Sequence, residues 1–120
     1  MPYVNRTTFE ISRLNKSSDN DYFYVDELIA HSIRSLNKKG YFTHFSCEGH
    51  HYQPKRFLEI VFWDEVDLPS LPEGYANTQC RLKYEYTSED IFKFAHEKAD
   101  ICMRLYVWAE SLPKNPFYYL

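Results

Sequence analysis

The segment TQCRLKYEYTSEDIFKFAHEKADICMRLYVWAESLP, residues 78–113, passes from the hydrophobic period of a strand to that of a helix. Apolar and polar side chains alternate over residues 78–86, which predicts a strand with one face on the core. After it the apolar side chains recur every three or four positions for about twenty residues, which predicts an amphipathic helix. We expect Thr87 or Ser88 to cap this helix and Pro113 to end it.

Four more elements are predicted upstream. Weak alternation predicts a short edge strand at residues 7–13, and helical spacing predicts an amphipathic helix at residues 22–39. Gly40 follows that helix and suits the left-handed conformation in which many helices end. Aromatic and β-branched residues predict strands at 41–47 and 56–63. The second of these strands is apolar on both faces apart from one glutamate, so we expect a central strand covered on both sides.

These elements follow in the order β-α-β-β-β-α, without a strand–helix–strand repeat. We therefore predict a single α+β domain over residues 1–120, built on a small, mostly antiparallel sheet of three or four strands. Both amphipathic helices are expected to pack on one face of that sheet. A chain of 120 residues can bury enough surface for such a core without a disulfide or a metal.

Charge and composition limit the classes of partner. Seventeen Asp and Glu residues against fourteen Lys and Arg residues leave a net charge of −3, which argues against nucleic acid as a general partner. Aromatic residues make up 18% of the chain and predict a sheet packed with aromatic side chains. A stacking platform for bases or sugars is the alternative, and it would need basic residues around the rings.

The compartment is predicted from the cysteines and from apolar runs. No N-terminal signal segment and no apolar run of about 20 residues occurs, so we expect no membrane partner. Cys47, Cys80 and Cys102 are odd in number and widely spaced, which argues against a disulfide framework and favours a reducing cytoplasm. The second and third of them fall on inward-facing stripes and are expected in the core. The final stretch NPFYYL, residues 115–120, predicts either a homodimer contact or a tail that packs on the sheet.

One stretch, HFSCEGHH at residues 44–51, holds a candidate site. We predict that a strand ends at Cys47 and that Gly49 permits a sharp turn with a positive φ. The C-x-x-H spacing of Cys47 and His50 allows a thiolate and an imidazole to hold the same metal ion. Together with His51 they form the predicted ligand set for zinc or another divalent transition metal, with water in a fourth position. Either histidine could face inward on such a turn.

Three other interpretations of the turn Cys47-Glu48-Gly49-His50-His51 remain open. Its amides and side chains could bind a small ligand through Cys47, Gly49, His50 and His51. Cys47 could instead be the nucleophile of an enzyme, with His50 as its base. The chain could also be a structural or interaction protein without a site, in which Cys47 is simply a buried apolar residue.

Glu59 is a second titratable group that the pattern places inside an apolar strand. A buried carboxylate there would have a raised pKa and could act as an acid or base. We expect the more common arrangement, in which the carboxylate pairs with a neighbouring cation such as Arg81 or Lys83.

The candidate turn also carries a resemblance. The segment GYFTHFSCEGH at residues 40–50, with LNKK before it and RFLEIVFW after it, resembles small uncharacterised bacterial and phage proteins that share the pattern G-[YF]-x-T-x-x-[ST]-C-x-G-H. That group implies no particular activity. A fainter resemblance is to the tRNA wybutosine-synthesising methyltransferase-associated family, whose strand reads T-x-S-S-C-S-G-R. It implies a tRNA-related role as an alternative, although this chain has histidine where that family has arginine. The matching residues are Thr43, Ser46, Cys47 and Gly49.

Overall fold

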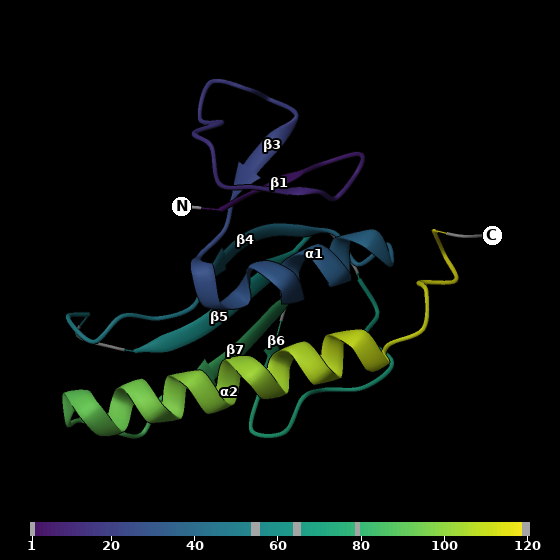
Figure 1. Cartoon of the computed structure of the whole chain (residues 1–120). Coiled ribbons are helices and arrows are strands. Elements are labelled where there is room, and N and C mark those ends of the chain that lie inside the picture. Colours follow the sequence, from purple (N-terminus) through teal and green to yellow (C-terminus); the bar gives the residue numbers. More distant parts are fainter. Residues whose placement is uncertain (1, 54–55, 64–65, 79, 119–120) are drawn as a thin grey trace.

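The computed structural model describes residues 2–53, 56–63, 66–78 and 80–118. Within these residues it forms two antiparallel sheets, two α-helices and a short 3-10 helix (Figure 1), which confirms the predicted α+β class. In chain order the elements are β1 (Tyr3–Asn5), β2 (Ile11–Ser12), β3 (Tyr22–Tyr24), η1 (Glu27–Ile29), α1 (Ala30–Lys38), β4 (Thr43–Cys47), β5 (Phe57–Phe62), β6 (Ala76–Thr78), β7 (Arg81–Glu85) and α2 (Ile91–Ser111).

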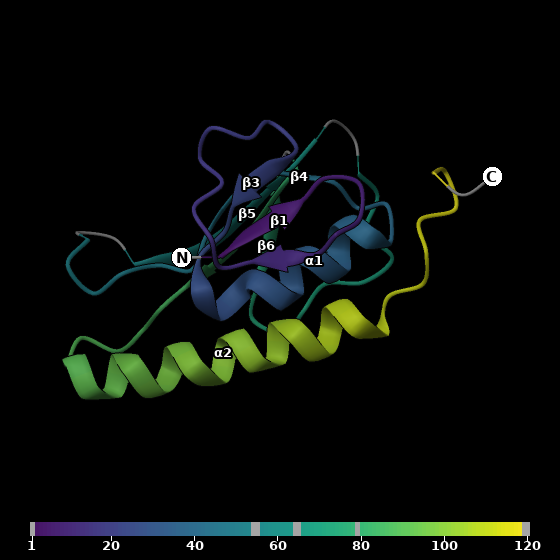
Figure 2. The ribbon, with the colours of Figure 1, turned by 45° about the horizontal axis from the view of Figure 1, so that its top comes forward.

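The larger sheet has the strand order β4-β5-β7-β6, and neighbouring strands are antiparallel. Leu58, Ile60 and Leu82 project from one face of this sheet and are completely buried. They share one hydrophobic core with Ile33 of α1 and Leu105 of α2. Both helices therefore cover the same face of the sheet, as predicted, and Figure 2 shows them together on that side.

The other face of the larger sheet is open among the described residues. β5 is one of the two inner strands, in agreement with its predicted central position, but its buried side chains alternate with the partly exposed Phe57, Glu59 and Val61. The prediction that this strand is covered on both sides was wrong. An antiparallel sheet can leave one face in contact with water, and apolar side chains on that face do not require a second covering layer.

A second, three-stranded sheet of order β2-β1-β3 was not predicted. Residues 22–24 were expected in a helix, but they pair with β1, with Val4 opposite Phe23. Aromatic side chains favour such a pairing, and it delays the start of α1 to Ala30. Of the edge strand predicted at residues 7–13, only Ile11–Ser12 pairs as a strand, and residues 7–8 belong to a turn.

Two boundaries of the strand–helix segment also differ from the prediction. Residues 76–78 form an additional strand, β6, that pairs with β7. The cap of α2 is Asp90, whose carboxylate accepts hydrogen bonds from the backbone N–H groups of Phe92 and Lys93. The amides of Thr87 and Ser88 instead donate to the Glu97 carboxylate. Thr87 and Ser88 both fit the sequence pattern of a helix cap, but the helix begins only at Ile91, directly after Asp90.

The described part of the C-terminal stretch packs back onto the loop between α1 and β4. Asn115 is buried, and its side-chain amide donates to the Gly40 carbonyl at 3.0 Å. Tyr118 packs edge-on against Phe42, with ring centroids 4.8 Å apart. Residues 119–120 of the predicted tail lie outside the described residues.

Cys102 lies in the core, as predicted. None of the described helices has the length and apolar character to cross a membrane.

Candidate metal centre

Three side chains with metal-binding atoms meet where β4 ends. They are Asp26, which precedes η1, Cys47, the last residue of β4, and His50, three positions further on. One carboxylate oxygen, the sulfur and one imidazole nitrogen all lie within 4.8 Å of one another. The structure therefore brings together two of the three predicted ligands and adds a carboxylate that the sequence pattern did not indicate.

The spacing of these atoms approaches that of a metal site. Bonds of about 2.0–2.3 Å to a tetrahedral zinc ion place neighbouring ligand atoms roughly 3.3–3.8 Å apart. His50 Nε2 lies 3.7 Å from Asp26 Oδ2, inside that range. The greatest separation in the group is at most 4.8 Å, about 1 Å above that range, so a small adjustment of the side chains would complete the geometry.

The Asp26 carboxylate is held by two donors. The Tyr24 hydroxyl donates to Oδ1 at 3.1 Å, and the Glu48 backbone N–H donates to Oδ2 at 2.9 Å. Asp26 occupies the N-cap position of η1, yet its side chain makes no capping hydrogen bond there. The carboxylate is directed across to the end of β4, and its remaining lone pairs are available for a metal.

The turn that follows Cys47 depends on Gly49, as predicted. Gly49 has a φ of +86°, and a Cβ at this position would lie 2.7 Å from the Phe57 carbonyl oxygen and 2.7 Å from the Tyr86 ring. The Tyr86 hydroxyl donates to the Glu48 carbonyl oxygen at 2.7 Å, which fixes the peptide just before the glycine. A side chain at residue 49 would therefore force the turn away from β5.

Glu48 supports the turn from the opposite side, although no sequence signal indicated this role. One oxygen of its buried carboxylate lies 2.8 Å from Lys98 Nζ, and the other accepts the Leu28 N–H at 2.8 Å. The carboxylate thus points toward the helices and not toward the metal-binding group. The two contacts connect the turn to α2 and to η1.

The surroundings of Cys47 raise the pKa of its thiol and so favour the neutral form. Burial raises the pKa of Cys47, and the nearby Asp26 carboxylate raises it further, while a hydrogen bond with the Gly49 backbone acts in the opposite direction. A catalytic thiolate requires a lowered pKa. A raised pKa therefore counts against a cysteine nucleophile that is activated by its surroundings.

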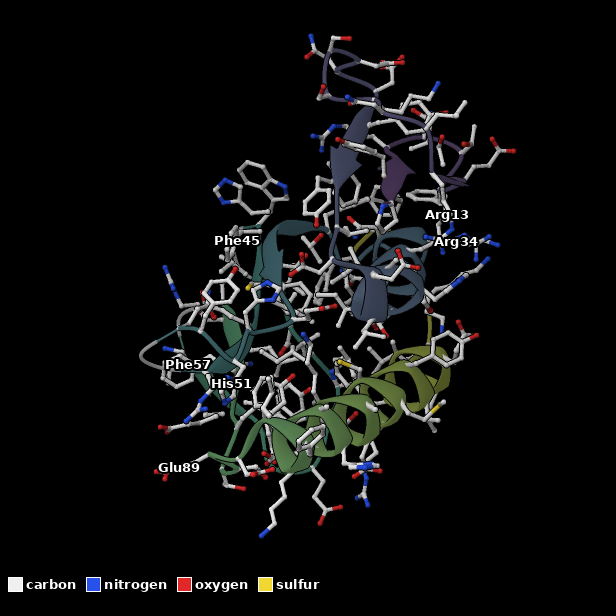
Figure 3. The ribbon with its side chains drawn as sticks, turned by 60° about the vertical axis from the view of Figure 1, so that its left-hand side comes forward. Arg13, Arg34, Phe45, His51, Phe57 and Glu89 are labelled. Carbon is white, nitrogen blue, oxygen red and sulfur yellow. The ribbon has the colours of Figure 1, made fainter. Side chains whose placement is uncertain are left out.

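The two neighbouring histidines have different surroundings. His50 belongs to the metal-binding group, its backbone N–H donates to the Gln53 side chain at 3.1 Å, and its ring stacks on Tyr52. His51 lies on the other side of the turn, where its Nε2 hydrogen bonds to the Glu89 carbonyl oxygen at 2.9 Å (Figure 3). His50, and not His51, is therefore the histidine that belongs to the metal-binding group.

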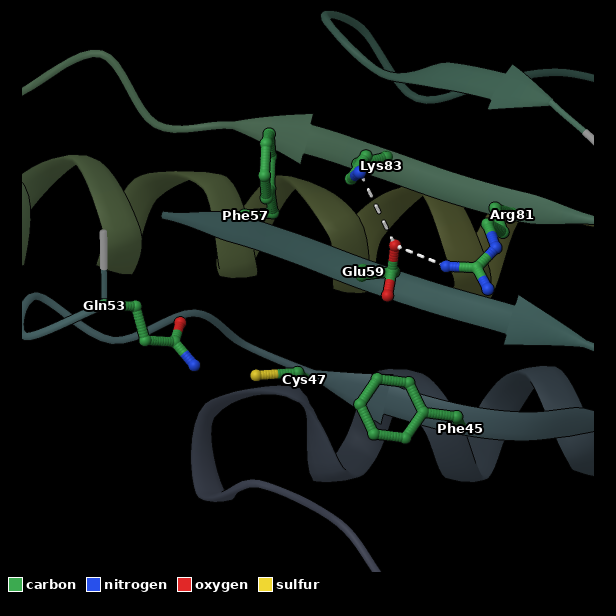
Figure 4. A pocket seen from close by; sticks show the side chains of 7 residues that line it. All are labelled: Phe45, Cys47, Gln53, Phe57, Glu59, Arg81 and Lys83. Carbon is green, nitrogen blue, oxygen red and sulfur yellow. Dashed lines mark hydrogen bonds and ion pairs between the residues drawn. The ribbon is translucent and has the colours of Figure 1, made fainter. Parts of the chain in front are cut away.

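Two further titratable side chains near the turn lie outside this group. His44 stacks on Trp63 with ring centroids 4.1 Å apart. The Glu59 carboxylate is 3.1 Å from an Arg81 nitrogen and 3.8 Å from Lys83 Nζ, which confirms the predicted pairing with these cations. Both cations and Glu59 line a cavity on the open face of the sheet, and Cys47 lines the same cavity (Figure 4).

Comparisons of the chain with protein-family models, with curated proteins and with solved structures found no match. The resemblance of residues 40–50 to small bacterial and phage proteins, and the fainter one to the wybutosine-associated family, therefore remain predictions.

Proposed function

We propose that the protein binds a divalent transition metal, with zinc the best candidate, through Asp26, Cys47 and His50. The observation that carries this proposal is the convergence of an oxygen, a sulfur and a nitrogen ligand within 4.8 Å of one another. Zinc accepts this mixed set of donors, whereas magnesium and calcium prefer oxygen ligands alone. The thiolate is the ligand that selects against those harder ions.

Three protein ligands leave one position of a tetrahedral ion for water or another ligand. Among the described residues no fourth cysteine, histidine or carboxylate joins the group. The side chain of His50 is 29% exposed, so small molecules can reach this side of the group. An open position of this kind is found in zinc sites that act on a ligand, whereas structural zinc sites are closed by four protein ligands.

A reducing compartment such as the cytoplasm would suit this site. Cys47 is a free cysteine, and its sulfur has to remain reduced to serve as a ligand. Loss of the thiolate by oxidation would remove the donor that distinguishes zinc from the harder cations.

A cobalt(II) titration of protein prepared without a histidine tag tests the proposal. Ligation of cobalt by a thiolate produces a charge-transfer absorption band, and added zinc should abolish this band by displacing the cobalt. We expect one ion per chain. Loss of an outer partner alone typically weakens a metal site by about 10–100-fold, so His50→Gln and Asp26→Asn should weaken binding at least as much.

His51→Gln is the matched control, because His51 is adjacent in sequence but hydrogen bonds to Glu89 outside the group. This variant should bind cobalt as the unmodified protein does. Absence of the thiolate band in the unmodified protein, or equal weakening by the substitutions at residues 50 and 51, would contradict the proposed ligand set.

A further inference from the structure

The open face of the larger sheet carries a cavity of about 680 Å³ next to Cys47 (Figure 4). This volume lies within the range of roughly 300–1,000 Å³ that is typical of small-molecule sites. Three adjacent strands contribute to it, each with side chains from the face opposite the helices. The strands contribute Phe45 and Cys47 of β4, Phe57 and Glu59 of β5, and Arg81 and Lys83 of β7.

The strand register explains why these side chains share one face. Cys47 is opposite Glu59, and Glu59 is opposite Lys83 on the next strand. Because side chains alternate along a strand, Phe45, two positions from Cys47, and Arg81, two positions from Lys83, project to the same side. The alternation that sends Leu58, Ile60 and Leu82 into the core therefore sends the aromatic and charged side chains into the cavity.

The cavity is electropositive on a chain that is acidic overall. Two cations, Arg81 and Lys83, face one carboxylate, Glu59, whereas the whole chain has a net charge of −3. Arg81 contacts Glu59 through one of its terminal nitrogens at 3.1 Å. A guanidinium carries five N–H donors, so others remain for an anion, and the side chain of Arg81 is 53% exposed. Phosphate is well matched to this planar fork.

Two phenylalanine rings line the same cavity as these cations. Lys83 Nζ lies 4.1 Å from the centroid of the Phe57 ring, so the ammonium group is already placed over an aromatic face. Phe45 is 53% exposed although its neighbour across the strand pair is the apolar Val61. An exposed ring in a cavity that also holds cations provides a surface on which a flat heterocycle can stack. The basic residues that a stacking platform requires are therefore present around these rings.

We infer that this cavity binds a small anionic ligand of the nucleotide class, with its flat ring stacked on Phe45 and its phosphate held by Arg81 and Lys83. Each group supplies a part of the recognition that the others lack, since the rings offer no charge and the cations offer no flat apolar surface. The ring and the phosphate could belong to a free mononucleotide or to the end of a single strand of nucleic acid. Cys47 also lines the cavity, but the residues that we propose to hold the ligand, Phe45, Arg81 and Lys83, are not ligands of the proposed metal site.

Calorimetric titrations in the presence of EDTA test this inference separately from the metal proposal. The probes are AMP, adenosine, inorganic phosphate and a short single-stranded oligonucleotide. We expect AMP to bind at least about tenfold more tightly than adenosine or phosphate alone, since only AMP offers both groups. An oligonucleotide that binds more tightly than AMP would support the site with a strand as the source of the ligand, and one that binds equally or less tightly would support it with a free nucleotide.

Three substitutions and one control complete the test. Arg81→Gln and Phe45→Ala should each weaken AMP binding about fivefold or more. Glu59→Gln should strengthen it, because the lining then gains one net positive charge. Arg104→Gln should have no effect, since Arg104 also pairs with carboxylates but lies on α2, away from the cavity. Melting curves of each variant establish that it is folded.

Several results would overturn the inference. It fails if AMP does not bind at millimolar concentration, or if phosphate alone binds as tightly as AMP. It also fails if Arg81→Gln and Arg104→Gln behave alike, or if Glu59→Gln weakens the binding. The last result would indicate a cationic ligand instead. None of these outcomes bears on the cobalt titration, because the substitutions at residues 45, 59 and 81 leave Asp26, Cys47 and His50 unchanged.

Discussion

The Glu48 carboxylate and the Lys98 ammonium group lie 2.8 Å apart, and only 10% and 13% of the two side chains are exposed. Glu48 belongs to the turn after β4, and Lys98 lies near the middle of α2. The pair therefore joins the turn that carries Cys47 and His50 to the longest helix of the protein. Its position predicts that the metal-binding turn and the packing of α2 are energetically coupled.

Lys98→Ala should destabilise the protein by about 3 kcal/mol, because it leaves the Glu48 carboxylate buried without its cation. Urea-induced unfolding of the variant measures this loss. Lys93→Ala is the control, since Lys93 is an exposed lysine of the same helix and its removal should change the unfolding free energy by less than about 0.5 kcal/mol. If the two variants lost equal stability, the pair would contribute nothing specific.

Tyr24→Phe should weaken metal binding by about tenfold while leaving the fold intact. The substitution removes the hydroxyl that donates to Asp26 Oδ1 at 3.1 Å, so the carboxylate loses one of its two positioning bonds. The cobalt titration described above measures the change. Tyr22→Phe, in the same strand, is the matched control and should bind cobalt normally. An unchanged affinity in Tyr24→Phe would show that the Glu48 amide alone positions Asp26.

Gly49→Ala should cost at least about 2 kcal/mol of unfolding free energy, because an alanine at a φ of +86° is strained. Its Cβ would also lie 2.7 Å from a backbone oxygen of Phe57, which cannot move away independently of β5. Gly74→Ala provides the comparison, since Gly74 has a similar φ but its nearest neighbour is a side-chain atom of Tyr84 at 3.1 Å. A smaller loss at residue 49 than at residue 74 would contradict this account of the turn.

Metal binding should release a proton from Cys47, and the affinity should rise with pH. The pKa of this thiol is raised above its ordinary value by burial and by Asp26, so the metal-free protein carries a neutral thiol at pH 7. Binding requires the thiolate, and roughly one proton should therefore leave with each zinc ion bound at that pH. Calorimetry in buffers with different ionisation enthalpies measures the number. Binding without proton release would show that Cys47 is not a ligand.

Some features of the fold follow from short-range patterns. The alternation of residues 81–85 and the helical spacing of residues 91–111 predicted β7 and α2 because each pattern is repeated within a single element. The turn at Gly49 was also predictable, since the requirement for a positive φ is a property of one residue and its neighbours. Such local signals were enough to predict the α+β class.

Other features had no local signal. Residues 22–24 form a strand only because β1 pairs with them, and a pairing partner cannot be recognised from the three residues themselves. Likewise, Thr87, Ser88 and Asp90 are all suitable helix caps. Asp90 is the residue that caps α2, while the amides of Thr87 and Ser88 donate to Glu97, a contact that the cap pattern alone does not indicate.

The candidate site divides in the same way. The C-x-x-H spacing pointed to Cys47 and to a histidine, because residues on one turn are close in space whatever the rest of the chain does. Asp26 lies close to them only because η1 packs beside the end of β4. The direction of the turn places His50, and not His51, in the group. A spacing rule describes neighbours along the chain, whereas a metal ion requires atoms that converge at one point. That convergence depends on contacts between distant segments, and only the tertiary structure supplies them.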